Sequence, residues 1–202
     1  MFNMNIFSTP LYLDLKQIDE IIKLNDRLTK SQVKTFYWAL PYNAVDRTSF
    51  EQSRSYTPEI NCFEDAQKYI EYSLEKGFDF IYLLNSVLGF AHEEEEFKKQ
   101  EEALDKLLNK LRKINSLKVR VVDYRLLEYI KKNYPDFEIY LSTSTEYTRI
   151  SQFQNVLKLF PYIKEVLPSY EMIRDFHFLK NLKKVMGNIN IELIVNEGCM
   201  TG

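Results

Sequence analysis

The sequence has 202 residues, of which 45% are hydrophobic and 28% charged, and its formal net charge at pH 7 is −2. A chain of this length and hydrophobic content can bury a large core as one domain over residues 1–202. The small net charge gives no field to attract a nucleic acid, no apolar run approaches the ~20 residues of a membrane span, and the first residues lack the basic region of a signal peptide.

We therefore expect a cytoplasmic protein without a nucleic-acid or membrane partner. The two cysteines, Cys62 and Cys199, are far apart and make no disulfide framework, which fits a reducing compartment.

Short apolar segments alternate along the chain with segments whose apolar residues recur at helical spacing. The predicted strands, in chain order, are residues 4–7, 33–40, 78–84, 117–122, 137–141, 162–167 and a seventh from residue 189. This alternation predicts an α/β fold of parallel strands with right-handed crossovers, a TIM-like (β/α) barrel of about seven βα units. Because a closed barrel needs eight strands and ~250 residues, we expect a truncated or open barrel and favour a fragment of a longer protein.

Residues 42–60 have no periodicity and predict a loop of uncommon length, which is typical of a lid, a binding loop or a disordered segment. Arg54 lies in this loop. Two interpretations stay open, a mobile surface loop and an anion-binding lid over the site that uses Arg54.

Polar residues follow several predicted strands at their carboxyl ends. In a parallel barrel these ends meet at one rim, so we expect the polar side chains to lie around one opening. The candidates for substrate binding there are Asn85, Ser142, Ser144, Glu171, Asn196 and Glu197.

The row of hydroxyls at residues 142–145 is compatible both with helix capping and with binding of an anion or a carbonyl oxygen. Asp123, after the fourth predicted strand, is interpreted as the cap of the helix that it precedes. The sequence contains no Gly-rich phosphate loop, no nucleophile elbow and no paired-His metal helix.

Four segments together resemble the collagenase-like peptidase family U32, and particularly its branch of short barrel proteins. They are residues 77–85, residues 141–145, Val166-Leu167 with Glu171 just after, and residues 191–199. The resemblance implies a (β/α) barrel in which the cysteine after the seventh strand, matched by Cys199, is the first of several thiolates that hold an iron–sulfur cluster. Relatives of this kind are linked to oxygen-independent hydroxylation of quinones or RNA bases, whereas the peptidase label rests on a few members.

Two departures from the family pattern stand out. Ser169-Tyr170 replaces the arginine that usually precedes the glutamate after strand six, and no cysteine follows Cys199 in this sequence. One thiolate cannot hold a four-iron cluster, which needs about four ligands. We therefore expect no cluster in this chain alone and one in a full-length form, with the other ligands beyond residue 202.

Three functional hypotheses follow. The first is an enzyme that binds a small or extruded planar substrate at the rim, with redox chemistry near Cys199. The second is a peptidase or other hydrolase in which Ser142 or Ser144 is the nucleophile and Glu171 the base. The third is a non-catalytic binding module that self-associates through its open barrel edges.

Overall fold

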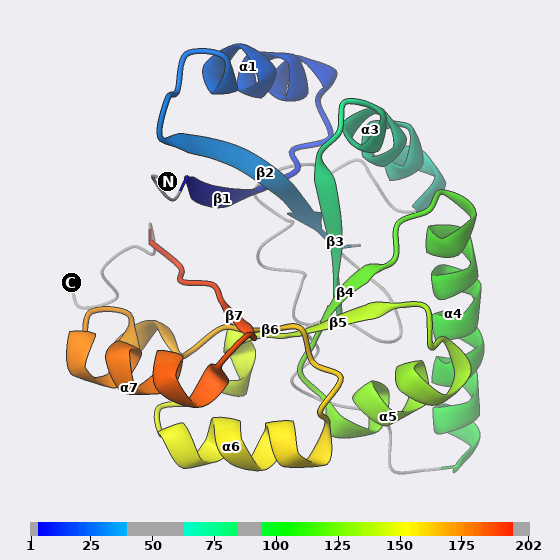
Figure 1. Cartoon of the computed structure of the whole chain (residues 1–202). Coiled ribbons are helices and arrows are strands. Elements are labelled where there is room, and N and C mark those ends of the chain that lie inside the picture. Colours follow the sequence, from blue (N-terminus) through cyan, green and yellow to red (C-terminus); the bar gives the residue numbers. More distant parts are fainter. Residues whose placement is uncertain (1–3, 40–62, 85–93, 196–202) are drawn as a thin grey trace, which may run out of the picture.

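The computed structural model describes residues 4–39, 63–84 and 94–195. The described strands form one seven-stranded sheet in the order β1 to β7, and each strand is parallel to its neighbours. The sheet curls into an open barrel with helices on its outer face and with β1 and β7 as its two edges (Figure 1). Within the described part of the chain, β1 and β7 are not paired with each other. The predicted open (β/α) barrel is confirmed.

The helices and strands alternate along the chain as predicted. The strands are β1 (Asn5–Pro10), β2 (Ser31–Trp38), β3 (Asp79–Leu84), β4 (Lys118–Val121), β5 (Glu138–Leu141), β6 (Glu165–Val166) and β7 (Asn190–Ile191). The α-helices are α1 (Leu15–Asn25), α3 (Phe63–Glu75), α4 (Glu94–Lys113), α5 (Tyr124–Asn133), α6 (Ile150–Leu159) and α7 (Phe176–Met186). Two short 3₁₀ helices, η1 (Thr143–Thr145) and η2 (Tyr170–Met172), follow β5 and β6.

Local sequence signals set several helix ends. Asp123 caps α5, because its Oδ1 accepts hydrogen bonds from the N–H groups of Arg125 at 2.7 Å and Leu126 at 3.1 Å. Gly77 follows α3 with a φ of +81°, a left-handed conformation that glycine adopts without strain. The predicted cap at Asp123 is confirmed.

Two predictions differ from the structure in extent. The sixth and seventh strands are only two residues long, because just Glu165–Val166 and Asn190–Ile191 pair in register, although the apolar runs around them are longer. The hydroxyl row after β5 opens the 3₁₀ helix η1 rather than an α-helix. Glu146, with a φ of +52°, ends that turn, and α6 begins only at Ile150.

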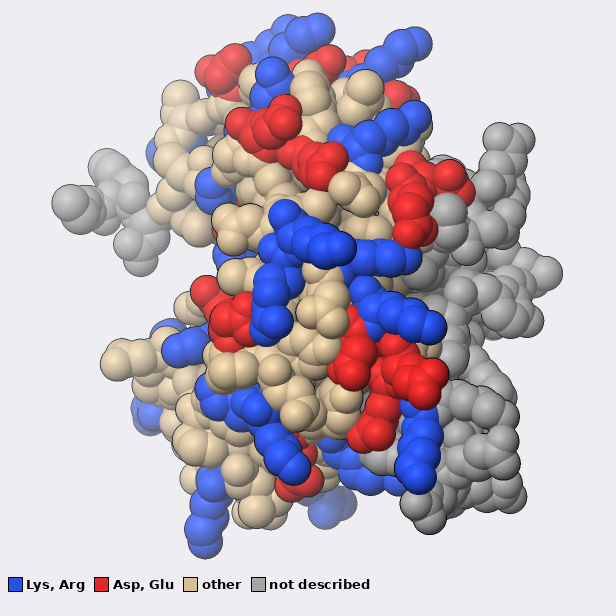
Figure 2. All heavy atoms as spheres, turned by 90° about the vertical axis from the view of Figure 1, so that its right-hand side faces the viewer, with Lys and Arg blue, Asp and Glu red and all other residues tan. Residues whose placement is uncertain are grey.

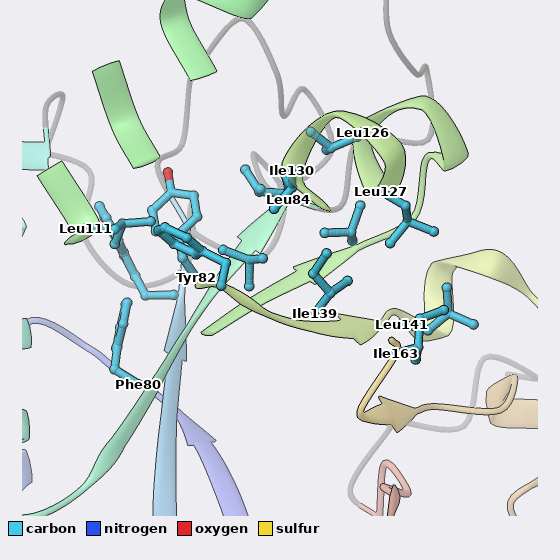
Figure 3. Packing of buried hydrophobic residues seen from close by; sticks show 14 of the residues in the cluster. Phe80, Tyr82, Leu84, Leu111, Leu126, Leu127, Ile130, Ile139, Leu141 and Ile163 are labelled. Carbon is cyan, nitrogen blue, oxygen red and sulfur yellow. The ribbon is translucent and has the colours of Figure 1, made fainter. Parts of the chain in front are cut away.

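The outer face of the sheet packs against the helices to form the main hydrophobic core. Phe80, Tyr82 and Leu84 project from β3 toward this face, where β5 and helices α4 and α5 contribute their own apolar side chains (Figure 3). Burial of each large side chain of this kind stabilises the fold by about 1.5–3 kcal/mol. This outer layer fixes the strands whose inner face carries the candidate site.

The surface over α3, α4 and α5 carries Lys, Arg, Asp and Glu side chains that are intermixed, without one sign dominating (Figure 2). Among the helices that the structure describes, none combines the length and apolar character that a bilayer crossing requires.

Candidate functional site

Side chains of the central strands alternate between the outer helices and the barrel interior, as the two-residue period of a strand requires. In β4, Val119 and Val121 are buried in the main core, so Arg120 between them faces the other way. A separate, smaller group of buried apolar residues lies on the inner face: Ala39, Ile81, Leu83 and Tyr140, with Tyr37 packed against them. The barrel interior is thus partly apolar and partly charged.

Arg120 is the centre of the charged part. It is 5% exposed, and its Nη2 donates a hydrogen bond of 2.8 Å to Glu165 Oε1 and another to the carboxylate of Glu192. Glu165 begins β6 and Glu192 directly follows β7, so one guanidinium from β4 links three strands across the interior. We call Arg120, Glu165 and Glu192 the Arg120 cluster.

One donor of the guanidinium is buried without a partner. Within the part of the chain that the structure describes, Nε of Arg120 is buried and has no hydrogen-bond partner. Since a buried donor without a partner costs about 1–3 kcal/mol, this atom can gain from a ligand oxygen or a water molecule.

The pKa values of the two carboxyl groups in the cluster are shifted in opposite directions. Burial raises the pKa of Glu165 to about 7, repulsion from Glu192 adds to the rise, and Arg120 opposes it. Burial also acts to raise the pKa of Glu192, but attraction to Arg120 and hydrogen bonds from Glu165 and the Ser8 side chain outweigh it and lower that pKa. Near neutral pH the pair therefore shares one proton, held by Glu165.

A second set of polar contacts joins side chains of β3, β4 and β5. Lys118 Nζ is 2.8 Å from Asp79 Oδ1, and the Tyr140 hydroxyl donates a 2.8 Å hydrogen bond to Glu138 Oε2. Burial and the neighbouring Glu138 raise the pKa of Tyr140, so its hydroxyl stays protonated. Tyr140 pairs in register with both Arg120 and Glu165, so this second set of contacts adjoins the Arg120 cluster on the inner face.

The predicted rim hydroxyls are engaged in hydrogen bonds with the backbone. Ser142 is fully buried and its Oγ accepts from the Ser144 N–H at 3.2 Å. Thr145 Oγ1 donates to the Ser142 carbonyl at 2.9 Å, and Thr143 Oγ1 donates to the Pro168 carbonyl at 3.0 Å. The turn therefore uses the hydroxyls of Ser142 and Thr145, and Thr143 joins the turn to the segment after β6. Ser144 is half-buried.

Glu171 lies in η2, after β6, and its side chain is exposed. Ser169, two residues before it, is buried, and its N–H donates to the Tyr147 carbonyl at 3.1 Å. The structure thus places Ser142 and Glu171 after neighbouring strands, one beneath the surface and the other on it.

The remaining candidates, Arg54, Asn85, Asn196, Glu197 and Cys199, lie outside the described residues. Asn85 directly follows β3, and Asn196 directly follows the last described residue, Val195. The roles assigned to all five stay predictions.

Whether this chain could hold an iron–sulfur cluster is judged from the side chains that could bind iron. The sequence holds two cysteines, fewer than the about four ligands of a four-iron cluster, and both lie outside the described residues. Within the described ranges, no group of three or more His, Cys, Asp or Glu side chains could hold a metal ion. The residues of this chain by themselves do not fit such a cluster.

Sequence reasoning missed the Arg120 cluster, because it treated residues 117–122 and 162–167 only as apolar strands. A signal was present in the alternation Lys118-Val119-Arg120-Val121. Strands of parallel sheets are usually apolar on both faces, so a charged residue in alternate positions marks a face with a special role.

Comparison with known proteins identifies the family of this chain. The model of Peptidase family U32 matches residues 42–200. The U32 peptidase Mk0906 superposes with a TM-score of 0.62 at 11% identity, over 95% of this chain and 67% of its own. Tryptophan synthase from M. tuberculosis superposes with a TM-score of 0.51 at 13% identity, over 95% of this chain and 73% of its own.

At such low identities, the two structural likenesses show the fold alone. No curated protein matches the sequence. The family model, however, spans most of the chain, including β3 to β7 and all three residues of the Arg120 cluster. The chain therefore belongs to peptidase family U32.

Proposed function

We propose that this chain is the barrel of a U32-family enzyme that binds a small molecule or a short peptide at the carboxyl-terminal rim of its strands. In this proposal Glu165 of the Arg120 cluster exchanges a proton with the substrate. The observation that carries it is one buried guanidinium shared by two carboxyl groups, of which one keeps its proton near neutral pH.

A purely structural role explains this arrangement less well. Burying an ion pair in place of apolar residues of similar size is often neutral or unfavourable for stability. The sheet has an apolar alternative beside the cluster, in the inner residues Ile81 and Leu83. Strongly shifted pKa values in the interior of a barrel are, in contrast, frequent at functional sites.

The roles of the three side chains follow from their charges. Glu165, with a pKa of about 7, can either donate or accept a proton at neutral pH, which suits a general acid or base. Glu192 stays ionised beside Arg120 and holds the guanidinium in place. Arg120 Nε is the donor that would hold a substrate oxygen near the Glu165 carboxyl.

A ligand titration tests the site directly. The Arg120 Nε–H signal would be followed by NMR in the intact chain while di- and tripeptides, and separately nucleosides, are added. We expect a saturable shift with one of the two panels. The variant Arg120→Lys, which lacks this N–H group, identifies the signal by its disappearance. The matched control Lys118→Arg should leave the shift unchanged, and no shift with either panel would contradict the proposal.

The peptidase form of the hypothesis has a specific test. A serine nucleophile needs a base within hydrogen-bond reach, but Ser142 is buried and accepts a backbone N–H, whereas Glu171 is exposed. If gelatin is cleaved, we expect activity to fall about 100-fold or more in Glu165→Gln and to survive in Ser142→Ala. The opposite pattern would favour Ser142 as the nucleophile.

The iron–sulfur part of the proposal concerns a protein that carries further cysteines after this chain. In such a protein, Cys199 would be one thiolate ligand, and the cluster would supply electron transfer. Anaerobic reconstitution should give visible absorption that Cys199→Ser removes and Cys62→Ser retains. A colourless, folded product would contradict the iron–sulfur part of the proposal and leave the proposed role of Glu165 untouched. Such a cofactor also suits the cytoplasm, the compartment that we propose from cysteine usage.

A further inference from the structure

Tyr140 occupies a central place on the inner face of the sheet. It lies on β5, between β4 and β6, and pairs in register with Arg120 on one side and with Glu165 on the other. The second in-register neighbour of Arg120 is Leu83 of β3, and that of Glu165 is Asn190 of β7. Of the described inner-face residues, Tyr140 is therefore the one that adjoins both partners of this ion pair.

The ion pair between Arg120 and Glu165 has to cross the strand that carries Tyr140. Neighbouring strands lie about 4.7–4.9 Å apart, so residues on β4 and β6 are separated by roughly twice that distance. Arg120 Nη2 nevertheless lies 2.8 Å from Glu165 Oε1. The two side chains therefore lean toward each other across β5, and their head groups meet beside the Tyr140 side chain.

The Tyr140 ring forms an apolar boundary of the pair. The residue is 8% exposed and belongs to the inner apolar group with Ile81 and Leu83. Its hydroxyl donates a 2.8 Å hydrogen bond to Glu138 Oε2, two residues earlier on the same strand, so its polar end is held toward the start of β5. The hydroxyl is thus engaged away from the ion pair, and the ring is the part of Tyr140 that shields it.

We propose that Tyr140 is a positioning residue of the candidate site, whose ring keeps water away from the Arg120–Glu165 pair and holds the two head groups against each other. Glu138 fixes the ring in turn, through the tyrosine hydroxyl. The inference rests on the proposed function, because it treats Glu165 as the group that exchanges a proton with a substrate.

The groups that face Glu165 determine the sign of the expected effect. Arg120 faces it from β4, Tyr140 from β5 and Glu192 from the segment after β7. Three further charged residues surround Tyr140 on the inner face: Asp79, Lys118 and Glu138. Burial is the largest cause of the raised pKa of Glu165, and the attraction to Arg120 that opposes it is smaller. Water admitted by loss of the ring would weaken both, so the pKa of Glu165 should fall.

NMR titration of the Glu165 side-chain carboxyl carbon in the intact chain tests the inference. In Tyr140→Ala the midpoint should fall from about 7 by about one pH unit or more, which is about a tenfold loss of proton affinity. Tyr140→Phe retains the ring and should keep a midpoint close to that of the wild type. Leu83→Ala is the matched control, because it removes an inner apolar side chain that flanks Arg120 but not Glu165, and it should shift the midpoint less than half as far.

Circular dichroism shows whether each variant is folded. If Tyr140→Ala does not fold, Tyr140→Leu takes its place, since it keeps apolar volume without a ring and should shift the midpoint in the same direction. A midpoint unchanged from the wild type in the folded variant would overturn the inference. An equal fall in Tyr140→Phe would overturn it too, because the effect would then belong to the hydroxyl. The proposed function fails by a different result, the absence of a ligand-induced shift at Arg120 Nε.

Discussion

The two faces of this sheet are built from the same strands but differ in chemistry: one is apolar and the other carries buried charges. On the outer face, Val119 and Val121 of β4 are fully buried in one apolar core that the helices complete. On the inner face, Arg120 lies between them in sequence and joins two carboxyl groups. The outer face therefore supplies most of the stability of the fold, whereas the inner face carries charges whose burial opposes it. For these charges we propose a functional role.

Truncating the outer face should have the largest effect. Phe80 is 1% exposed, and Phe80→Ala should lower the free energy of unfolding by about 3–5 kcal/mol, since it removes buried apolar area and leaves a cavity. Urea unfolding followed by circular dichroism measures the change. A loss below about 1 kcal/mol would mean that the outer face does not dominate stability.

On the inner face, Arg120→Met should cost about 3 kcal/mol at pH 8, because it leaves two buried carboxylates without their cation. At pH 5 the cost should be smaller, since both carboxyls can then take up protons. The matched control is Lys118→Met, whose pair with Asp79 is partly exposed and should contribute about 1 kcal/mol or less. Equal costs for the two variants would show that the Arg120 cluster has no special energetics.

The proton on Glu165 makes the contribution of the inner face to folding stability depend on pH, whereas the apolar outer face has no such dependence. Because the folded pKa of Glu165 is raised to about 7 from an ordinary value of 4.5, its contribution to stability is fully present below pH 4.5 and is lost as the pH rises through 7. The lowered pKa of Glu192 has the opposite effect on stability: its contribution is present above the ordinary value of 4.5 and is lost as the pH falls below it. Between pH 4.5 and 7, therefore, the change belongs to Glu165.

We expect wild-type stability to fall by about 2 kcal/mol across this window relative to Glu165→Gln, which cannot titrate. Unfolding free energies of both proteins at pH 5, 6, 7 and 8 provide the comparison. Parallel pH profiles would place the Glu165 pKa near that of an ordinary glutamate.

The smallest predicted effect concerns the helix that covers the outer face next to β4. Asp123→Ala removes the side-chain acceptor of two N–H groups at the start of α5 and should cost about 1 kcal/mol. Asp123→Asn retains an acceptor and should recover most of the loss in a thermal unfolding experiment.

The fold could be predicted from the sequence because its signals are local. Apolar segments alternate with helical periodicity, Asp123 caps α5 and Gly77 ends α3, and each of these signals involves residues that are close in sequence. The lengths of β6 and β7 could not be predicted, since pairing depends on the neighbouring strand as well as on apolar content.

The Arg120 cluster could not be predicted for a related reason. Arg120 lies 45 residues from Glu165 and 72 residues from Glu192, so no motif spacing joins them. Only the parallel pairing and curling of β4 to β7 bring the three side chains together. At the rim the sequence identified polar positions such as Ser142 but could not show that its hydroxyl accepts a bond from the adjacent turn.

The barrel interior holds a proton near neutral pH between two carboxyl groups fixed by Arg120. An NMR titration of the Glu165 side-chain carboxyl carbon, assigned by comparison with Glu165→Gln, measures this directly. We expect a midpoint at about pH 7 that moves when Glu192 is replaced by Gln. A midpoint near the ordinary value of 4.5, unaffected by Glu192→Gln, would contradict it.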